Sequence, residues 1–148
     1  MLAFNDWKEI GLFFKDNIDK INSFVYGSSE EDIQLKINKL DMDDYPVLVG
    51  IIPSSDSTSK NLDERTYEDV LFFYVLMPIK DRTIDEEDIV RSDTQEAIQK
   101  IEHLIMDNYE EKPLFRRIHT NSIHYDPEYG IWNSTGWSVA FILENDYL

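Results

Sequence analysis

Residues 67–77, with the sequence YEDVLFFYVLM, decide the fold of this chain. Aromatic and β-branched side chains crowd the second half of the segment, and such residues favour a strand. Pro78 follows and ends the pairing. A second run, residues 45–52 (YPVLVGII), is nearly continuous in apolar residues, as in a strand buried on both faces. These two runs predict the centre of a β-sheet.

Helical patterns lie on both sides of these strands. Near the N-terminus, apolar residues recur at intervals of three or four and predict one amphipathic helix that stops at residues 27–29. A second helix is predicted from Thr83, because Glu86 stands at capping-box spacing and residues 85–88 place negative charge at the positive end of the helix dipole. The apolar residues of the first helix are Phe4, Trp7, Ile10, Phe14, Ile18, Ile21 and Val25.

The remaining segments are less regular. Residues 33–37 alternate apolar and polar and favour a strand, although a short helix reaching Leu40 is the alternative, because Ser28 and Glu31 resemble a capping box. Residues 54–64 are polar and serine-rich and predict a long loop. The last third predicts a hairpin, with a strand at 115–125, a turn at 126–130 and a return strand at 137–143.

The order of these elements predicts an α+β fold. An antiparallel or mixed sheet, with an N-terminal helix and one long helix packed on one face and a terminal β-hairpin, buries these apolar surfaces most simply. The chain has 148 residues, of which 42% are hydrophobic, and neither a linker nor a repeat interrupts it. Residues 1–148 are therefore expected to form a single domain.

The net charge of the chain limits the classes of partner that it is expected to bind. There are 30 acidic and 14 basic residues, for a net charge of −16, and such a field repels nucleic acid. The acids are spread along the chain, as on a solvated surface. Without cysteine, a signal peptide or an apolar run long enough to span a bilayer, the chain is expected to be cytoplasmic and to have no membrane partner.

No catalytic motif stands out. His119 and His124 lie close to Asp126, but their odd spacing on a strand points the two histidines to opposite faces unless a bulge intervenes. The sequence lacks a Gly-x-Ser-x-Gly elbow, and its five glycines form no phosphate-binding loop. We therefore expect no enzymatic activity, no metal and no cofactor.

Two aromatic residues are candidates for partner binding. Tyr129 and Trp132 flank Gly130 at the predicted turn, beside Asp126. Tyrosine and tryptophan give a large contact area for little loss of entropy, which suits a protein-binding anchor. The alternative is that both rings fold back onto the sheet.

Three segments, together with the element order, resemble phage tail terminator and tail-completion (head–tail joining) proteins. The segments are residues 45–53 (YPVLVGIIP), 70–75 (VLFFYV) and 130–141 (GIWNSTGWSVAF), the last of which is also similar to uncharacterised proteins from phages and prophages of Bacteroides-like bacteria. The resemblance implies a non-enzymatic virion part that contacts tail-tube or neck proteins, commonly as a self-associated hexameric ring. It also implies assembly in the bacterial cytoplasm, and it makes residues 54–64, including Asp56 and Lys60, a candidate contact with a neighbouring subunit.

The charge leaves a second hypothesis open. An acidic inhibitor or immunity-type protein captures a basic partner quickly, because opposite charges steer the encounter.

Overall fold

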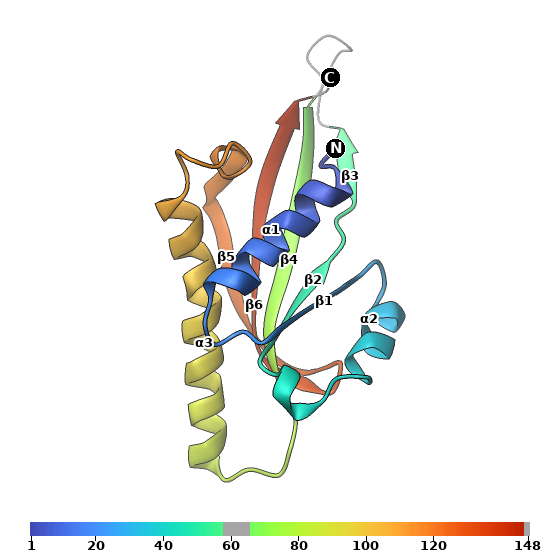
Figure 1. Cartoon of the computed structure of the whole chain (residues 1–148), viewed down its shortest axis with the longest axis vertical. Coiled ribbons are helices and arrows are strands. Elements are labelled where there is room, and N and C mark those ends of the chain that lie inside the picture. The colour runs from blue at the N-terminus through green and yellow to red at the C-terminus, as the bar shows by residue number, and fades with distance from the viewer. Residues whose placement is uncertain (58–65, 147–148) are drawn as a thin grey trace.

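The computed structural model describes residues 1–57 and 66–146 of the chain (Figure 1). The sheet has the strand order β1-β2-β4-β6-β5, with β3 paired to β4; β1 and β2 are parallel and the other pairs are antiparallel. The predicted α+β class with a mixed sheet is confirmed. The elements are α1 (Phe4–Asn17), β1 (Ser23–Gly27), α2 (Glu30–Ile37), the 3₁₀ helix η1 (Met42–Asp44), β2 (Val47–Ile51), β3 (Ser55–Ser57), β4 (Thr66–Pro78), α3 (Ile84–Asp107), the 3₁₀ helix η3 (Phe115–Arg117), β5 (Ile118–Ile131) and β6 (Ser134–Asp146).

Helices α1 and α3 pack on one face of the sheet, which we call the front face (Figure 1). Along β4, Leu71, Phe73 and Val75 point into this front core and are fully buried. Tyr74 and Leu76, which alternate with these residues along the strand, point to the opposite face, which we call the back face. They pack there with α2. The long helix on one side of the sheet is thus confirmed, and α2 adds a second, smaller core on the other.

Phe73 stands at the centre of the front core. Its ring lies 6.0 Å from Trp7 and 5.4 Å from Phe14, both in α1, and 6.2 Å from Phe141 in β6. Side-chain hydrogen bonds also fix α3 to the sheet: Trp137 Nε1 donates to the Arg91 carbonyl oxygen over 3.0 Å.

The prediction that the first helix runs to Val25 is wrong. Helix α1 ends at Asn17, and residues 23–27 form β1, paired in parallel with β2. The apolar spacing continues past the end of the helix, but Phe24 lies directly against Gly11 of α1, where an added Cβ would collide with the ring. The chain therefore turns back beneath its own helix.

The preference for a strand at residues 33–37 is also wrong. These residues lie in α2, whose N-cap is Ser29: its side chain accepts a hydrogen bond from the Asp32 amide over 3.2 Å. Ile33 and Ile37 are one helical turn apart and are buried, whereas Leu35 is exposed. The alternation in the sequence reflected one exposed leucine and not a pleated strand.

The terminal hairpin exists, but its boundaries differ from the prediction. Strands β5 and β6 extend towards each other until only Trp132 and Asn133 join them, so residues 126–130 lie in β5 and not in a turn. Gly130, at φ 87°, marks a shift in the pairing register that lets the strand continue. Because Pro127 stands on an edge strand, its missing amide costs little.

The predicted loop at residues 54–64 is in part a strand. Residues 55–57 form β3 and pair with residues 67–69 of β4, because the chain leaving β2 stays alongside the long central strand. The predictions for β2, β4 and α3 are confirmed, including the cap in which the Thr83 side chain accepts from the Glu86 amide.

We expect Phe73→Ala to lower the free energy of unfolding by about 3–5 kcal/mol, because it leaves a cavity among three aromatic side chains. The neighbouring Phe72→Ala is the matched control: Phe72 points to the back face and is 39% exposed, so about 1 kcal/mol or less is expected. Urea unfolding of both variants measures the difference. Equal losses would contradict the assignment of the two faces.

Candidate protein-binding face

The turn of the hairpin holds Trp132 in place. Trp132 and Asn133 have φ values of 48° and 56°, the left-handed conformation that a two-residue type I′ hairpin turn requires. For a bulky residue this conformation is strained. The strain is offset because the ring is buried and meets Tyr74 at 5.1 Å and 82°. Trp132 therefore belongs to the back-face core and presents no exposed anchor.

Tyr129 is the exposed member of the predicted aromatic pair. Its side chain is 67% accessible, and it lies in the edge strand β5 opposite Thr135. Asp126 is paired with Ser138, three residues further along β6, and strand alternation points it to the other face. The structure thus does not bring Tyr129, Trp132 and Asp126 together as one exposed patch.

The other two predicted contact residues are Asp56 and Lys60, and the structure describes the side chain of neither. The backbone of Asp56 belongs to β3. Lys60 lies outside the described residues.

Several carboxylates lie on the back face near the hairpin turn. Burial raises the pKa of the Tyr74 hydroxyl above its usual range, and the negative charges of Glu128, Glu30 and Asp126 raise it further. The Ser138 hydroxyl donates to Glu128 Oε1 over 3.0 Å and orients that carboxylate. The register of β5 places Asp126 and Glu128 near the hairpin turn, and Glu30 and Glu31 of α2 lie beside the same turn, so these acids form a patch that the linear sequence did not reveal.

A hollow of about 400 Å³ lies at the α2 side of this patch. The N-terminal turn of α2 and the hairpin tip line it, and its charged groups are the carboxylates of Glu30 and Glu31. Acids in the first turn of a helix are favourable in themselves, because they complement the helix dipole. We call Glu30, Glu31, Asp126 and Glu128 the acidic patch. The lining residues of the hollow are Glu30, Glu31, Gln34, Gly130, Ile131 and Trp132.

Beyond the acidic patch, apolar side chains lie on the back face where no described element covers them. In β4, Val70 is 42% and Phe72 39% exposed. The sheet register places half-buried neighbours beside them: Ile51 and Ala140 flank Phe72, and Ile142 lies opposite Val70. We call these five residues the apolar strip. An antiparallel sheet with one solvated face usually carries polar residues at such positions.

Both histidines of β5 lie along this strip. The register shifts between His119, opposite Ile142, and His124, opposite Ala140, so both point to the back face. The bulge that the odd spacing required is therefore present. Each imidazole Nε2 faces a carboxylate: Glu144 at 3.4 Å from His119 and Asp126 at 3.1 Å from His124.

These pairs do not extend to a metal site. Within residues 1–57 and 66–146, no three histidine, aspartate or glutamate side chains converge as metal ligands.

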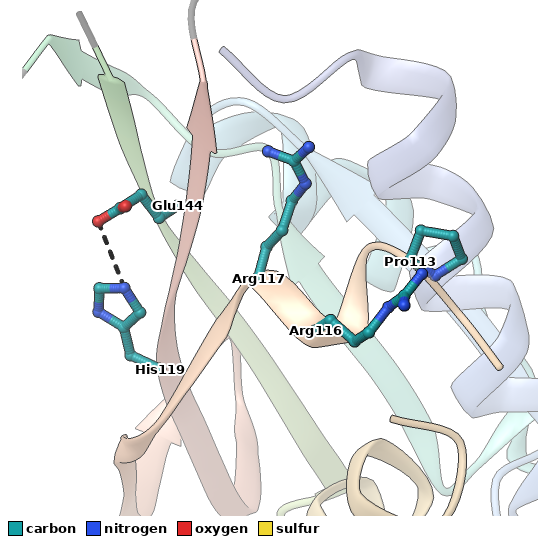
Figure 2. Close-up of a pocket in the computed structure, with 5 residues that line it drawn as sticks. All are labelled: Pro113, Arg116, Arg117, His119 and Glu144. Carbon is teal, nitrogen blue, oxygen red and sulfur yellow. Dashed lines mark ion pairs between the residues drawn. The ribbon is translucent and has the colours of Figure 1, made fainter. Parts of the chain in front are cut away.

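A shallow pocket of about 430 Å³ lies at the upper end of β5 and β6, lined by Pro113, Arg116, Arg117, His119 and Glu144. Figure 2 shows His119 and Glu144 turned toward each other, while the two arginine side chains point in different directions. The arginines lie in η3, which Phe115 anchors by packing its buried ring against Phe13 and Phe14. The guanidinium groups do not converge on one point, so this pocket has no focused anion site.

No protein-family model matches the chain, and no curated protein matches it. In the part of the chain that the structure describes, none of the helices combines the length and apolar character needed to cross a membrane.

The different positions of the two aromatic residues predict different effects of their removal. Trp132→Ala should lower the free energy of unfolding by about 3 kcal/mol or more, because it empties the space beside Tyr74. Tyr129→Ala should change it by about 0.5 kcal/mol or less, as for an exposed side chain. Chemical denaturation checks both, and a larger loss for Tyr129→Ala would refute the placement.

Proposed function

We propose that this chain is a non-enzymatic structural protein that acts in phage tail completion or head–tail joining by contacting other proteins. The observation that carries the proposal is the apolar strip on the back face, where Phe72 and Val70 remain in contact with solvent. The resemblance in element order supports the same role. On this proposal the protein is assembled in the bacterial cytoplasm and then becomes part of the virion.

The apolar strip favours protein contact because exposed apolar side chains gain free energy when a partner covers them. Each 100 Å² of apolar surface removed from water contributes about 2.5 kcal/mol. Contiguous exposed apolar surface rimmed by polar groups is typical of interaction sites. The acidic patch and the two histidine pairs form such a rim around Phe72 and Val70.

Self-association into a ring needs a different surface. A ring forms through heterologous contacts, in which two unlike patches of the same chain meet. The exposed Tyr129 on the edge strand β5 is a candidate for one of these patches. Residues 54–64, with Asp56 and Lys60, remain the proposed contact with a neighbouring subunit.

A second candidate function is favoured by the acidic patch. An inhibitor or immunity-type protein would use Glu30, Glu31, Asp126 and Glu128 to hold a basic toxin or nuclease. Its association would weaken steeply between about 50 and 500 mM salt, over the range in which screening shortens the reach of surface charges.

Affinity purification with the neighbouring genes co-expressed separates the two functions. We expect the tagged chain to retain capsid, portal, neck or tail proteins, identified by mass spectrometry. Retention of a basic toxin that is released by 500 mM salt would instead establish the second candidate. A chain that retains neither class of protein would contradict both.

Light scattering and negative-stain electron microscopy test for a ring. We expect the purified chain, alone or with the tail protein it retains, to give one defined oligomer larger than a dimer. Tyr129→Ala should shift this oligomer towards monomer, while Met106→Ala, which also removes an exposed side chain, on α3, should leave it intact. A strict monomer under both conditions would exclude the ring.

A further inference from the structure

We propose that the back face binds a cationic amphipathic helix of a partner protein, with the apolar side of the helix on the apolar strip and its Lys and Arg side chains over the surrounding carboxylates. The inference rests on the proposed role in protein contact and names the surface and the chemistry of the partner.

The charges around the strip favour a partner with cationic side chains. The acidic patch lies at one end, near the hairpin turn, and Glu68 and Glu144 stand directly opposite each other at the other end. Like charges at directly opposed positions destabilise a sheet, so a cationic group between them would relieve this repulsion. Of the two, Glu144 has a partner in His119 at 3.4 Å. Because Arg116 and Arg117 line the same pocket as Glu144, the attraction for positive charge is strongest at the end that holds the acidic patch.

The same charges disfavour a second copy of this chain as the occupant. Two back faces brought together would oppose carboxylates to carboxylates at both ends of the strip, and each chain carries a net charge of −16. Juxtaposed like charges across an interface cost several kcal/mol. A partner with the opposite charge avoids this cost.

The fold favours a helix as the partner segment, because α2 already packs on the same face of the sheet. Its two buried residues, Ile33 and Ile37, pack with Val25, Val47 and Val49. Helix α2 has eight residues and is about 12 Å long, so it covers the part of the face near β1 and β2. A partner helix would continue this layer over β4 and β6.

The width of the strip matches one helix. Ile51, Phe72 and Ala140 stand side by side on the adjacent strands β2, β4 and β6. Strands are about 4.8 Å apart, so these three residues span about 10 Å. A helix with its side chains has a diameter of about 10 Å.

The test uses a fluorescein-labelled 18-residue peptide of leucine and lysine in amphipathic helical order, with a leucine–glutamate peptide as its counterpart. We expect saturable binding of the cationic peptide by fluorescence anisotropy and none of the acidic peptide. The double variant Val70→Ser, Phe72→Ser should weaken binding at least 10-fold with little change in thermal unfolding. Its control is Ile84→Ser, Ile89→Ser, which changes two exposed residues of α3 and should bind like the wild type.

A matched pair of charge variants separates the local field from the total charge. Glu30→Gln with Asp126→Asn should weaken binding at least 5-fold. Glu110→Gln with Asp107→Asn removes the same charge at the last residue of α3 and just beyond it, and should change binding less than 2-fold. Equal effects of the two pairs would mean that only the total charge attracts the peptide, and the inference would fall.

Methyl NMR tests where on the surface the peptide binds. The methyl signals of Val70, Ala140 and Ile142 should shift on titration, while those of Ile98 and Ile101 in the front core should not. Absence of binding, or shifts confined to another surface, would overturn the inference. The inference would also be overturned if the wild type forms a dimer and the Val70→Ser, Phe72→Ser variant is a monomer. If that variant still retains tail proteins in the purification described above, the proposed function stands and only this site for it fails.

Discussion

The alternation of side chains along β4 is the constraint on which the rest of the structure depends. This strand pairs with β2, β3 and β6, so its residues stand in the middle of both faces of the sheet. Leu71, Phe73 and Val75 fill the front core beneath α1 and α3. Residues of the opposite parity pack with α2 and with Trp132 of the hairpin turn, and α2 is too short to reach Phe72. The exposed apolar strip is thus a consequence of unequal helical cover.

Local signals were sufficient for β4 and α3. β4 was predictable because its apolar and β-branched residues exceed what any solvated segment carries. Helix α3 was predictable because Thr83 and Glu86 cap it and its buried residues recur with helical period. In both cases the fold class followed, because a long strand and a long helix already require a sheet with a helix packed upon it.

The misassigned elements are those whose structure depends on distant residues. Residues 23–27 continue the helical spacing of α1, yet they pair with β2, more than 20 residues further along the chain. The position of the hairpin turn depends on the burial of Trp132 against Tyr74, which outweighs the preference of Pro127 and Gly130 for a turn. The acidic patch joins Glu30 with Glu128, and no local pattern could place these residues together.

The net charge and the apolar strip together restrict the choice of partner. An exposed apolar surface alone would bind many proteins, including further copies of the same chain, since the hydrophobic effect has no direction. Carboxylates at both ends of the strip make most of those contacts unfavourable, which is how specificity is obtained by penalising the wrong partner. The same negative charge that keeps free copies apart therefore leaves Phe72 and Val70 accessible to a cationic surface. On this argument the acids of the back face act mainly on partner choice, and the apolar strip supplies most of the affinity.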